Sequence, residues 1–310
     1  MKSVLTILFL PYLVFGSIFE ISNSPVGIKS SGMSNSDLAV IHRGSFLSNP
    51  AILGFQKGAY LNSSYYNYFS DIYLAGVCYS HPDLVFDNSS TGFSMFSIDY
   101  GNFEDIETGY QYRPYELMLA LSQGYSLFGV SAGVSVKYVY SSITSDHTST
   151  GLMTDITFLY EIIEHKAAFS SGLFNLGSQL TRYYHTAEDI IPFTRTGFSY
   201  KLDKLPLTLT LVHEYFFAEL NKNNFMTGLE LKAKENLTVR AGYDISGPDK
   251  QIGTNSKSEK FSGLSFGTTI FINEYEFDIA YILRGELENE FGMSVNFNIS
   301  EFINNKKGGQ

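Results

Sequence analysis

Two stretches of the chain have the G-x-S-x-G spelling of a serine nucleophile. They are 129–133, with Ser131 at the centre, and 263–267, with Ser265 at the centre. Such a serine performs acyl transfer when a strained turn between a strand and a helix exposes its hydroxyl. Both stretches instead lie within runs that alternate large and small residues, which is typical of a strand. We therefore expect no catalytic residue and no enzymatic activity, and an outer-membrane hydrolase is the weakest of three hypotheses.

A zinc site is the second chemistry that residue types suggest. His213-Glu214 begins like the H-E-x-x-H helix of zinc proteases, but Phe217 occupies the position of the second histidine. The six histidines show no ligand spacing, and the chain contains neither a P-loop nor a G-x-G-x-x-G stretch. The sequence therefore predicts neither a metal nor a cofactor.

The composition and the first residues indicate an exported protein rich in strands. Lys2, the apolar run Val4–Phe15 and the small residue Gly16 form a signal peptide, expected over residues 1–16. The 310 residues include 22 Tyr and 26 Phe, and only 17% are charged, against about 25% in ordinary globular domains. Aromatic residues favour sheets. The net charge of −10 leaves no basic patch for a nucleic acid, and the single cysteine, Cys78, excludes an intrachain disulfide.

A period of two dominates the chain from about Lys57 to Ser300. In the run 291–299, large apolar residues alternate with small or polar ones, and 275–283 and 130–140 repeat the pattern. Successive side chains of a strand point to opposite faces, so each strand has one apolar and one polar wall. Charged residues fall on the polar rows, which we expect to face a lumen: Asp99, Asp155, Glu161, Glu214, Arg240, Asp244, Glu276 and Asp278.

The length of the alternating runs favours a membrane barrel over a soluble sheet. We identify fifteen segments, and many reach 11–15 residues, which is long enough to cross a hydrocarbon core at a tilt. Bacterial barrels usually have an even number of strands, so 105–112 is predicted to be loop and fourteen strands remain. Short joints alternate with long polar ones around 81–91, 177–193 and 246–259, which indicates turns at one end and loops at the other. A soluble exported β-sandwich has shorter strands and stays the alternative.

The predicted fold is therefore all-β, an antiparallel transmembrane β-barrel of about fourteen strands over 57–300. Residues 17–56 precede it as a mixed segment of coil and short helix, and 301–310 follow it as a polar tail. Within the N-terminal segment, Asn49-Pro50 suits a tight turn, because proline fixes its own φ and favours an extended conformation for Asn49.

The order of several short motifs resembles the PorV/PorQ family of outer-membrane barrels, which are related to the long-chain fatty-acid transporters. Ser31–Ile41 and the step Ser48–Leu53 resemble the opening of that family. Further matches follow in the same order, at Tyr65–Ile72, Ile98–Phe103, Val136–Ile143, Leu173–Gln179 and Leu205–Leu209. The order is closest to the PorQ branch. The chain departs from the family pattern at His42-Arg43-Gly44, where an acidic pair is usual, and in the tail after Ser300.

The resemblance implies a location in the outer membrane and a part in type IX secretion. The barrel would receive or attach cargo that bears a sorting domain, with other secretion components and membrane lipid as its partners. The alternative is a transporter or porin for hydrophobic small molecules. The resemblance also implies that 25–56 packs in the lumen as a plug, whereas a plain turn is the simpler interpretation of Asn49-Pro50. The residues that carry the family pattern are Gly32, Met33, Asn49, Pro50, Asn67, Tyr68, Phe69, Asp71, Asn175 and Gly177.

Overall fold

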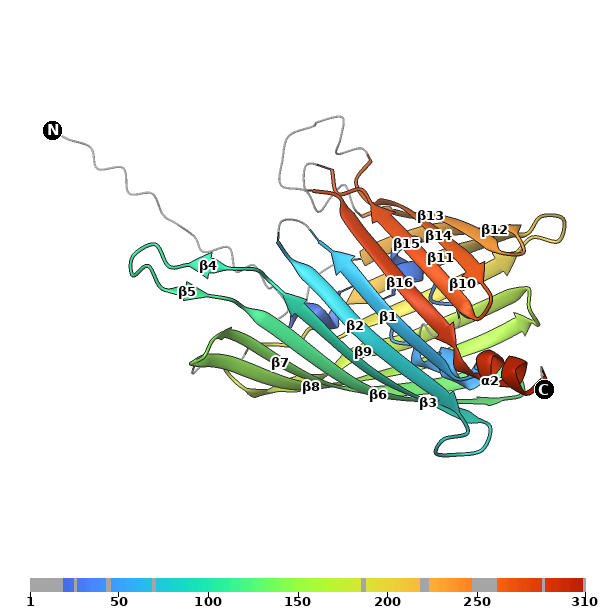
Figure 1. Ribbon diagram of the computed structural model, residues 1–310, viewed down its shortest axis with the longest axis horizontal. Coiled ribbons are helices and arrows are strands. Elements are labelled where there is room, and N and C mark those ends of the chain that lie inside the picture. The colour runs from blue at the N-terminus through green and yellow to red at the C-terminus, as the bar shows by residue number, and fades with distance from the viewer. Residues whose placement is uncertain are drawn as a thin grey trace.

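The fold is a closed antiparallel β-barrel, as the computed structural model shows in Figure 1. The structure describes residues 19–24, 27–42, 46–68, 71–184, 188–217, 223–246, 261–285 and 288–308. Among them, fourteen strands form the wall: β1 (Tyr60–Asn67), β2 (Tyr73–Pro82), β3 (Ser89–Asp99), β6 (Tyr115–Leu127), β7 (Val130–Thr144), β8 (His147–Ile163), β9 (Ala167–Thr181), β10 (Phe193–Lys201), β11 (Leu207–Phe216), β12 (Asn223–Lys234), β13 (Leu237–Asp244), β14 (Leu264–Ile272), β15 (Tyr275–Ile282) and β16 (Glu290–Asn298). The predicted fold class and the number of strands are confirmed.

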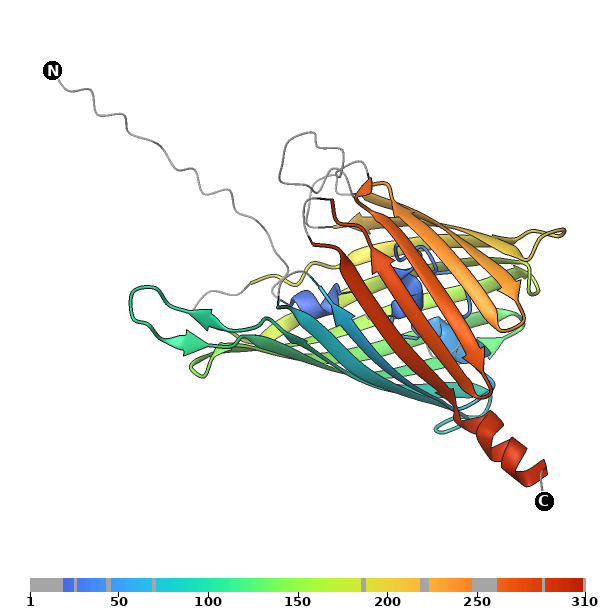
Figure 2. The ribbon, with the colours of Figure 1, turned by 45° about the horizontal axis from the view of Figure 1, so that its top comes forward.

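The first and last strands close the barrel. β1 pairs with β16 along its whole length, from Tyr60 opposite Asn298 to Asn67 opposite Phe291. The segment 105–112, predicted to be loop, lies outside the wall in the connection between β3 and β6. There β4 (Phe103–Glu104) and β5 (Gln111–Tyr112) make a short hairpin, which projects beyond the rim of the barrel in Figure 2.

The outer surface is apolar and the inner surface is polar, as the alternating pattern predicted. On β15, Tyr275, Phe277, Ile279 and Tyr281 are 39–47% exposed, whereas Asp278 between them is 2% exposed. An apolar outer wall with a polar interior is what a membrane-embedded barrel requires, because lipid cannot hydrate polar side chains. No helix among the described residues is long and apolar enough to cross a membrane.

The two ends of the barrel carry connections of different length. Two-residue turns join β6 to β7 and β12 to β13, whereas the connections after β3, β9 and β13 are much longer and lie at the opposite end. The two-residue β7–β8 turn is an exception at that opposite end. The interpretation of 81–91 as one of the long loops is wrong. β2 continues to Pro82 and β3 begins at Ser89, so the connection between them is only 83–88. This connection lies at the end with the short turns. Residues 247–260, most of the predicted loop 246–259, lie outside the described residues.

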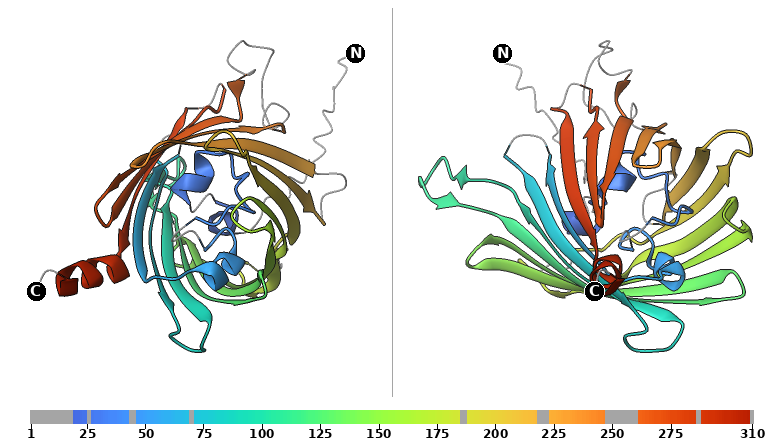
Figure 3. Two further views of the ribbon diagram at one scale, coloured as in Figure 1. Left: turned by 90° about the vertical axis from the view of Figure 1, so that its right-hand side faces the viewer. Right: turned by 45° about the vertical axis from the view of Figure 1, so that its right-hand side comes forward.

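The described part of 19–56 lies inside the barrel, as the view along its length shows (Figure 3), and we call it the plug. It contains η1 (Glu20–Ser22), α1 (Ile28–Ser31) and η2 (Pro50–Phe55). Most of its apolar side chains are buried, with Phe19, Met33 and Leu53 each 0% exposed. The segment 301–310, predicted as a polar tail, belongs through Gly308 to the helix α2 (Ile299–Gly308), which projects away from the wall in Figure 2. The predicted signal peptide, 1–16, lies outside the described residues.

Candidate lumenal binding site

The plug approaches the wall most closely where strands present glycine to the lumen. A Cβ atom added to Gly133 of β7 would lie 2.2 Å from the backbone nitrogen of Ala51, and one added to Gly242 of β13 would lie 2.1 Å from the carbonyl carbon of Met33. Neither distance leaves room for a side chain. Glycine at these inward positions therefore lets backbone pack against backbone, a role that glycine often has inside a strand.

The two serines of the G-x-S-x-G stretches form hydrogen bonds to the plug. Ser131 of β7 donates a hydrogen bond to the carbonyl oxygen of Ala51 at 2.6 Å. The Ser265 hydroxyl of β14 lies 2.8 Å from the Ser34 hydroxyl, which also bonds the carbonyl oxygen of Gly263 at 2.8 Å. Both serines are 0% exposed, and both lie within strands rather than at a strand-to-helix turn. Their geometry supports docking of the plug and not nucleophilic attack.

The Asn49 side chain forms hydrogen bonds to three parts of the structure: the start of η2, the Leu38 segment of the plug, and β9. Its Oδ1 accepts from the backbone of Ala51 at 3.1 Å, while its Nδ2 donates to the Leu38 carbonyl at 2.7 Å and to the Ser170 hydroxyl of β9 at 2.9 Å. Pro50 follows at the first position of η2, where a missing N–H costs nothing. Asn49 therefore caps η2 and also fixes the plug to the wall.

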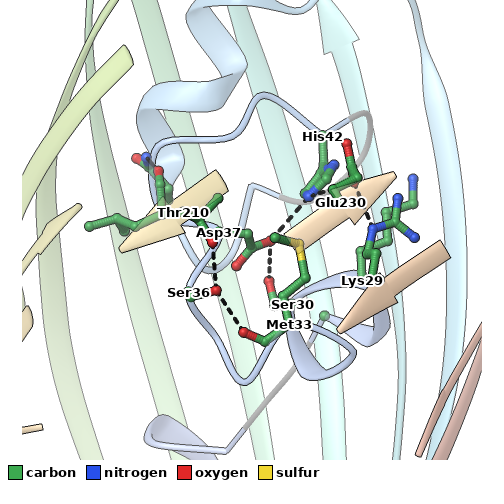
Figure 4. Close-up of polar contacts among 12 residues, drawn as sticks. Lys29, Ser30, Met33, Ser36, Asp37, His42, Thr210 and Glu230 are labelled. Carbon is green, nitrogen blue, oxygen red and sulfur yellow. Dashed lines mark hydrogen bonds and ion pairs between the residues drawn. The ribbon is translucent and has the colours of Figure 1, made fainter. Parts of the chain in front are cut away.

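A buried network of charges connects the plug to β12, β13 and β15. Lys29 donates to Glu276 at 2.5 Å, and both side chains are less than a tenth exposed. Ser30 donates to Asp37 at 2.7 Å and Ser36 lies 2.7 Å from the Thr210 hydroxyl, as Figure 4 shows. On the wall, Arg240 pairs with Glu230 at 2.7 Å.

Burial and charge act in opposite directions on the two basic side chains of the plug. Burial disfavours the charged form of Lys29, but Asp278 and Glu276 outweigh it and raise the pKa of Lys29 above its ordinary value. His42 Nε2 lies 3.4 Å from Asp37 Oδ2 and 3.8 Å from Glu230 Oε2. Burial nevertheless lowers the pKa of His42, because Arg240 and Lys29 offset the two carboxylates. The folded protein therefore favours neutral His42.

A β-bulge in β9 lies beside the plug. The register between β8 and β9 shifts between Thr154 and Ile156, so Phe174 and Asn175 both point inward. Asn175 has φ +56°, which asparagine tolerates better than most residues. Its backbone N–H donates to Asp155 at 2.9 Å, and its amide bonds Lys137 at 2.6 Å and Asn23 of the plug at 2.9 Å.

The lumen contains a cavity of about 490 Å³ between the plug and the wall. It lies toward the end with the longer loops, since Phe216, Asp244 and Ile282 at the ends of their strands line it. One wall is aromatic: the ring centroids of Phe174 and Phe193 are 5.2 Å apart, as are those of Phe193 and Phe216. The plug contributes hydroxyl and amide groups to the lining, from Ser22, Asn23, Ser24, Ser30, Ser31, Ser34, Asn35 and Ser48.

The structure brings together only some of the residues that the sequence singled out. Gly32, Met33, Asn49 and Pro50 are plug residues in contact with the wall, and Asn175 lies in the bulge. The others are scattered: Asn67 ends β1, Tyr68 lines the cavity, Asp71 is exposed in a turn, and Gly177 lies where a side chain would collide with the Leu152 carbonyl. Phe69 lies outside the described residues.

Sequence reasoning missed the aromatic wall. Phe174, Phe193 and Phe216 are far apart along the chain. Phe193 falls in the predicted loop 177–193, although the structure places it at the start of β10, and Phe174 and Phe216 are single aromatic residues on the inward rows of their strands. Glycine recurs on the inward row of many strands, and this is the signal in the sequence that could have indicated where the plug docks. The sequence analysis treats these glycines only as small residues of the polar face. Among the residues that the structure describes, no group of three or more His, Cys, Asp or Glu side chains could hold a metal ion.

The likeness to known proteins is one of fold. No protein-family model matches the chain, and no curated protein matches it. Among solved structures, the Pseudomonas putida toluene transporter TodX is similar with a TM-score of 0.59 and 12% identity, over 88% of this chain and 96% of that one. The Ralstonia pickettii toluene transporter TbuX has a TM-score of 0.56 and 11% identity, over 88% and 98%. A Pseudomonas aeruginosa FadL homologue has a TM-score of 0.54 and 10% identity, over 87% and 97%.

Proposed function

We propose that this protein is a channel of the bacterial outer membrane through which small hydrophobic or amphiphilic molecules pass, with the plug as its gate. The observation that carries the proposal is the cavity of about 490 Å³ between the plug and an aromatic wall. Cavities of about 300–1,000 Å³ with apolar lining and a few polar groups are the usual form of small-molecule sites. The likeness of the fold to two toluene transporters supports the same reading.

The gate can be tested by locking the plug to the wall. The hydroxyl oxygens of Ser34 and Ser265 are 2.8 Å apart, so cysteines at both positions place two sulfurs within reach of a disulfide. The lock is Ser34→Cys with Ser265→Cys in a Cys78→Ser background. The matched control is Thr150→Cys with Thr181→Cys, whose hydroxyl oxygens are 2.9 Å apart and which joins β8 to β9 without touching the plug.

The measurement is uptake of radiolabelled toluene by cells whose outer membrane carries each variant. We expect the unlocked channel to raise uptake above that of cells without it, the lock to abolish the gain, and a reductant to restore it. The control disulfide should leave uptake unchanged. Uptake that is equal with and without the channel would contradict the channel function, and uptake unaffected by the lock would contradict gating by the plug.

A part in type IX secretion is a second candidate, and one surface favours it. The β4–β5 hairpin carries stacked rings of Phe103, Tyr110 and Tyr112, with Ile106 at its tip 99% exposed. It stands at the end with the longer loops, where a cargo protein or another secretion component could bind. The test compares the secreted proteins of cells with the gene, without it, and with Ile106→Ser. If sorting-domain proteins are secreted equally in all three, this candidate is wrong.

A further inference from the structure

We infer that the lumenal cavity binds an uncharged aromatic molecule that carries a hydroxyl group, of the phenol or benzyl-alcohol class. The inference rests on the proposed channel function and narrows the class of compound that the channel would take. Three properties of the cavity lead to it: its paired charges, the hydroxyl groups of the plug, and the continuous aromatic wall.

The charges of the cavity disfavour an anion such as a fatty-acid carboxylate. The lining contains four carboxylates (Glu20, Asp155, Glu214 and Asp244) and three cations. Each cation already pairs with a carboxylate: Lys137 with Asp155 at 2.8 Å, Arg195 with Glu214 at 2.7 Å, and Arg284 with Glu290 at 2.7 Å. An anionic ligand would have to break one of these pairs and leave a poorly hydrated charge without its partner, which is costly.

The plug side of the cavity disfavours a pure hydrocarbon. Eight serine and asparagine side chains of the plug line it. Several of their hydroxyls already donate within the protein, as Ser22 does to the Phe19 carbonyl at 2.7 Å and Ser30 to Asp37 at 2.7 Å. A hydroxyl that donates keeps lone pairs free to accept. A hydrocarbon would displace water from these oxygens and form no hydrogen bond in its place, which costs free energy. The O–H of a phenol or an alcohol can instead donate a hydrogen bond to them.

The aromatic wall of the cavity favours an aromatic ring over a sugar. Phe174 and Phe193 stack at an interplanar angle of 11°, and Phe216 continues the row. Met226 lines the cavity beside these rings, and Leu38 and Val212 pack behind them. The Arg195 guanidinium, which pairs with Glu214, lies 5.6 Å from the centroid of Phe193 and 5.9 Å from that of Phe174. A flat aromatic ligand can extend such a stack and bury its whole face. A sugar would place hydroxyl groups against apolar atoms there.

Calorimetric titration of the detergent-solubilised full chain tests the inference with four probes. They are 4-hydroxybenzyl alcohol, toluene, octanoate and glucose. We expect 4-hydroxybenzyl alcohol to bind at least about tenfold more tightly than each of the others, because only it satisfies both the rings and the hydroxyl groups. Equal or tighter binding of toluene, octanoate or glucose would overturn the inference, and so would the absence of binding by 4-hydroxybenzyl alcohol.

A pair of matched variants locates the site. Phe193→Leu removes the central ring of the aromatic wall but keeps an apolar side chain, and we expect it to weaken binding of 4-hydroxybenzyl alcohol about tenfold. Phe198→Leu makes the same change on the same strand at an outward position that is 42% exposed, and should not alter binding. Heat-modifiable gel migration shows whether each barrel folds. Binding that survives Phe193→Leu in a folded barrel would place the ligand elsewhere.

A reporter in the cavity gives a second measurement. The chain has no tryptophan, so Phe216→Trp provides a single emission from the edge of the aromatic wall. We expect 4-hydroxybenzyl alcohol to change this emission with the affinity found by calorimetry; an emission that does not respond would contradict binding at this wall. If no probe binds while toluene uptake persists, the inference fails and the channel function stands. If 4-hydroxybenzyl alcohol binds while no compound is taken up, the inferred binding site is supported and the channel function fails.

Discussion

Gly133 of the wall and Ala51 of the plug are in direct backbone contact: a Cβ atom on Gly133 would lie 2.2 Å from the Ala51 nitrogen. Gly124 of β6 makes a similar approach, because a Cβ atom on it would lie 2.6 Å from the Gly54 nitrogen. These two wall glycines therefore let η2 dock closely. The Thr157 hydroxyl of the neighbouring strand also accepts a hydrogen bond from the Ala51 nitrogen at 3.0 Å. Plug and wall are thus complementary at the level of single atoms, and small changes on either side should alter docking.

Gly133→Val should undock η2 while leaving the barrel folded, because a side chain at 133 collides with backbone that cannot move aside. Overpacking usually costs about 1–3 kcal/mol and occasionally more, and a collision with backbone that cannot move aside exceeds this range. Leu47 of the plug is partly buried against the core and lines the cavity, so Leu47→Trp, in a chain without tryptophan, reports docking. We expect Gly133→Val to shift this emission to the red before any urea is added. Ala132→Val, at the adjacent outward position, is the control and should leave the emission unchanged. A blue emission in Gly133→Val would show that the contact is not needed for docking.

Asn49→Ala should weaken docking by about 2–3 kcal/mol, because it removes a helix cap and leaves the buried Leu38 carbonyl without its donor. The urea midpoint of the Leu47→Trp emission measures the loss. Asn289→Ala, in an exposed loop, is the comparison, and surface changes of this kind usually cost less than about 0.5 kcal/mol. Equal midpoints for the two variants would mean that Asn49 acts only as a turn residue.

The barrel could be predicted because each strand repeats the same physical constraint. Lipid outside and a polar lumen inside force a period of two on every strand, and β15 shows it without interruption from Tyr275 to Ile282. The β2–β3 turn was misplaced because Ser, Asn and Asp in 83–90 suggest a long loop whether or not the strands continue close to it. Only pairing with neighbouring strands reveals the true length of the turn.

The site could not be predicted because it depends on contacts without a local pattern. The plug is irregular, with short turns of helix, so no periodicity shows which of its side chains face the wall. The bulge that turns Asn175 inward breaks the period of two within β9, and its positive φ leaves no signal beyond the presence of asparagine. Gly32, Met33, Asn49 and Pro50 belong to the family pattern that the sequence resembles, but that pattern does not show which wall residues they contact.

The Lys29–Glu276 pair should show strong coupling in a double-mutant cycle. Lys29→Met removes the cation beside the buried Glu276 carboxylate, and Glu276→Gln leaves Lys29 with Asp278 as its neighbouring carboxylate. Losing one member of a buried pair costs about 3–5 kcal/mol, with the smaller cost expected for Glu276→Gln. The double variant should cost less than the sum of the two, because the Lys29–Glu276 interaction is then lost only once. The urea midpoint of the Leu47→Trp emission gives each value. Additive costs would show that the two side chains do not interact.

Docking of the plug should weaken in mild acid because of His42. Its pKa is lowered from 6.5 in the docked plug, chiefly by burial, whereas an undocked plug in water holds a histidine near its ordinary value. The undocked state then binds more protons, so docking is strongest above the ordinary pKa and weakens as the pH falls below it. We expect the urea midpoint of the Leu47→Trp emission to fall between about pH 7.5 and about pH 5.5, where carboxylates of ordinary pKa stay charged. His42→Gln, which keeps a polar group but cannot titrate, should remove most of that fall. An unchanged pH profile in His42→Gln would assign the effect to another group.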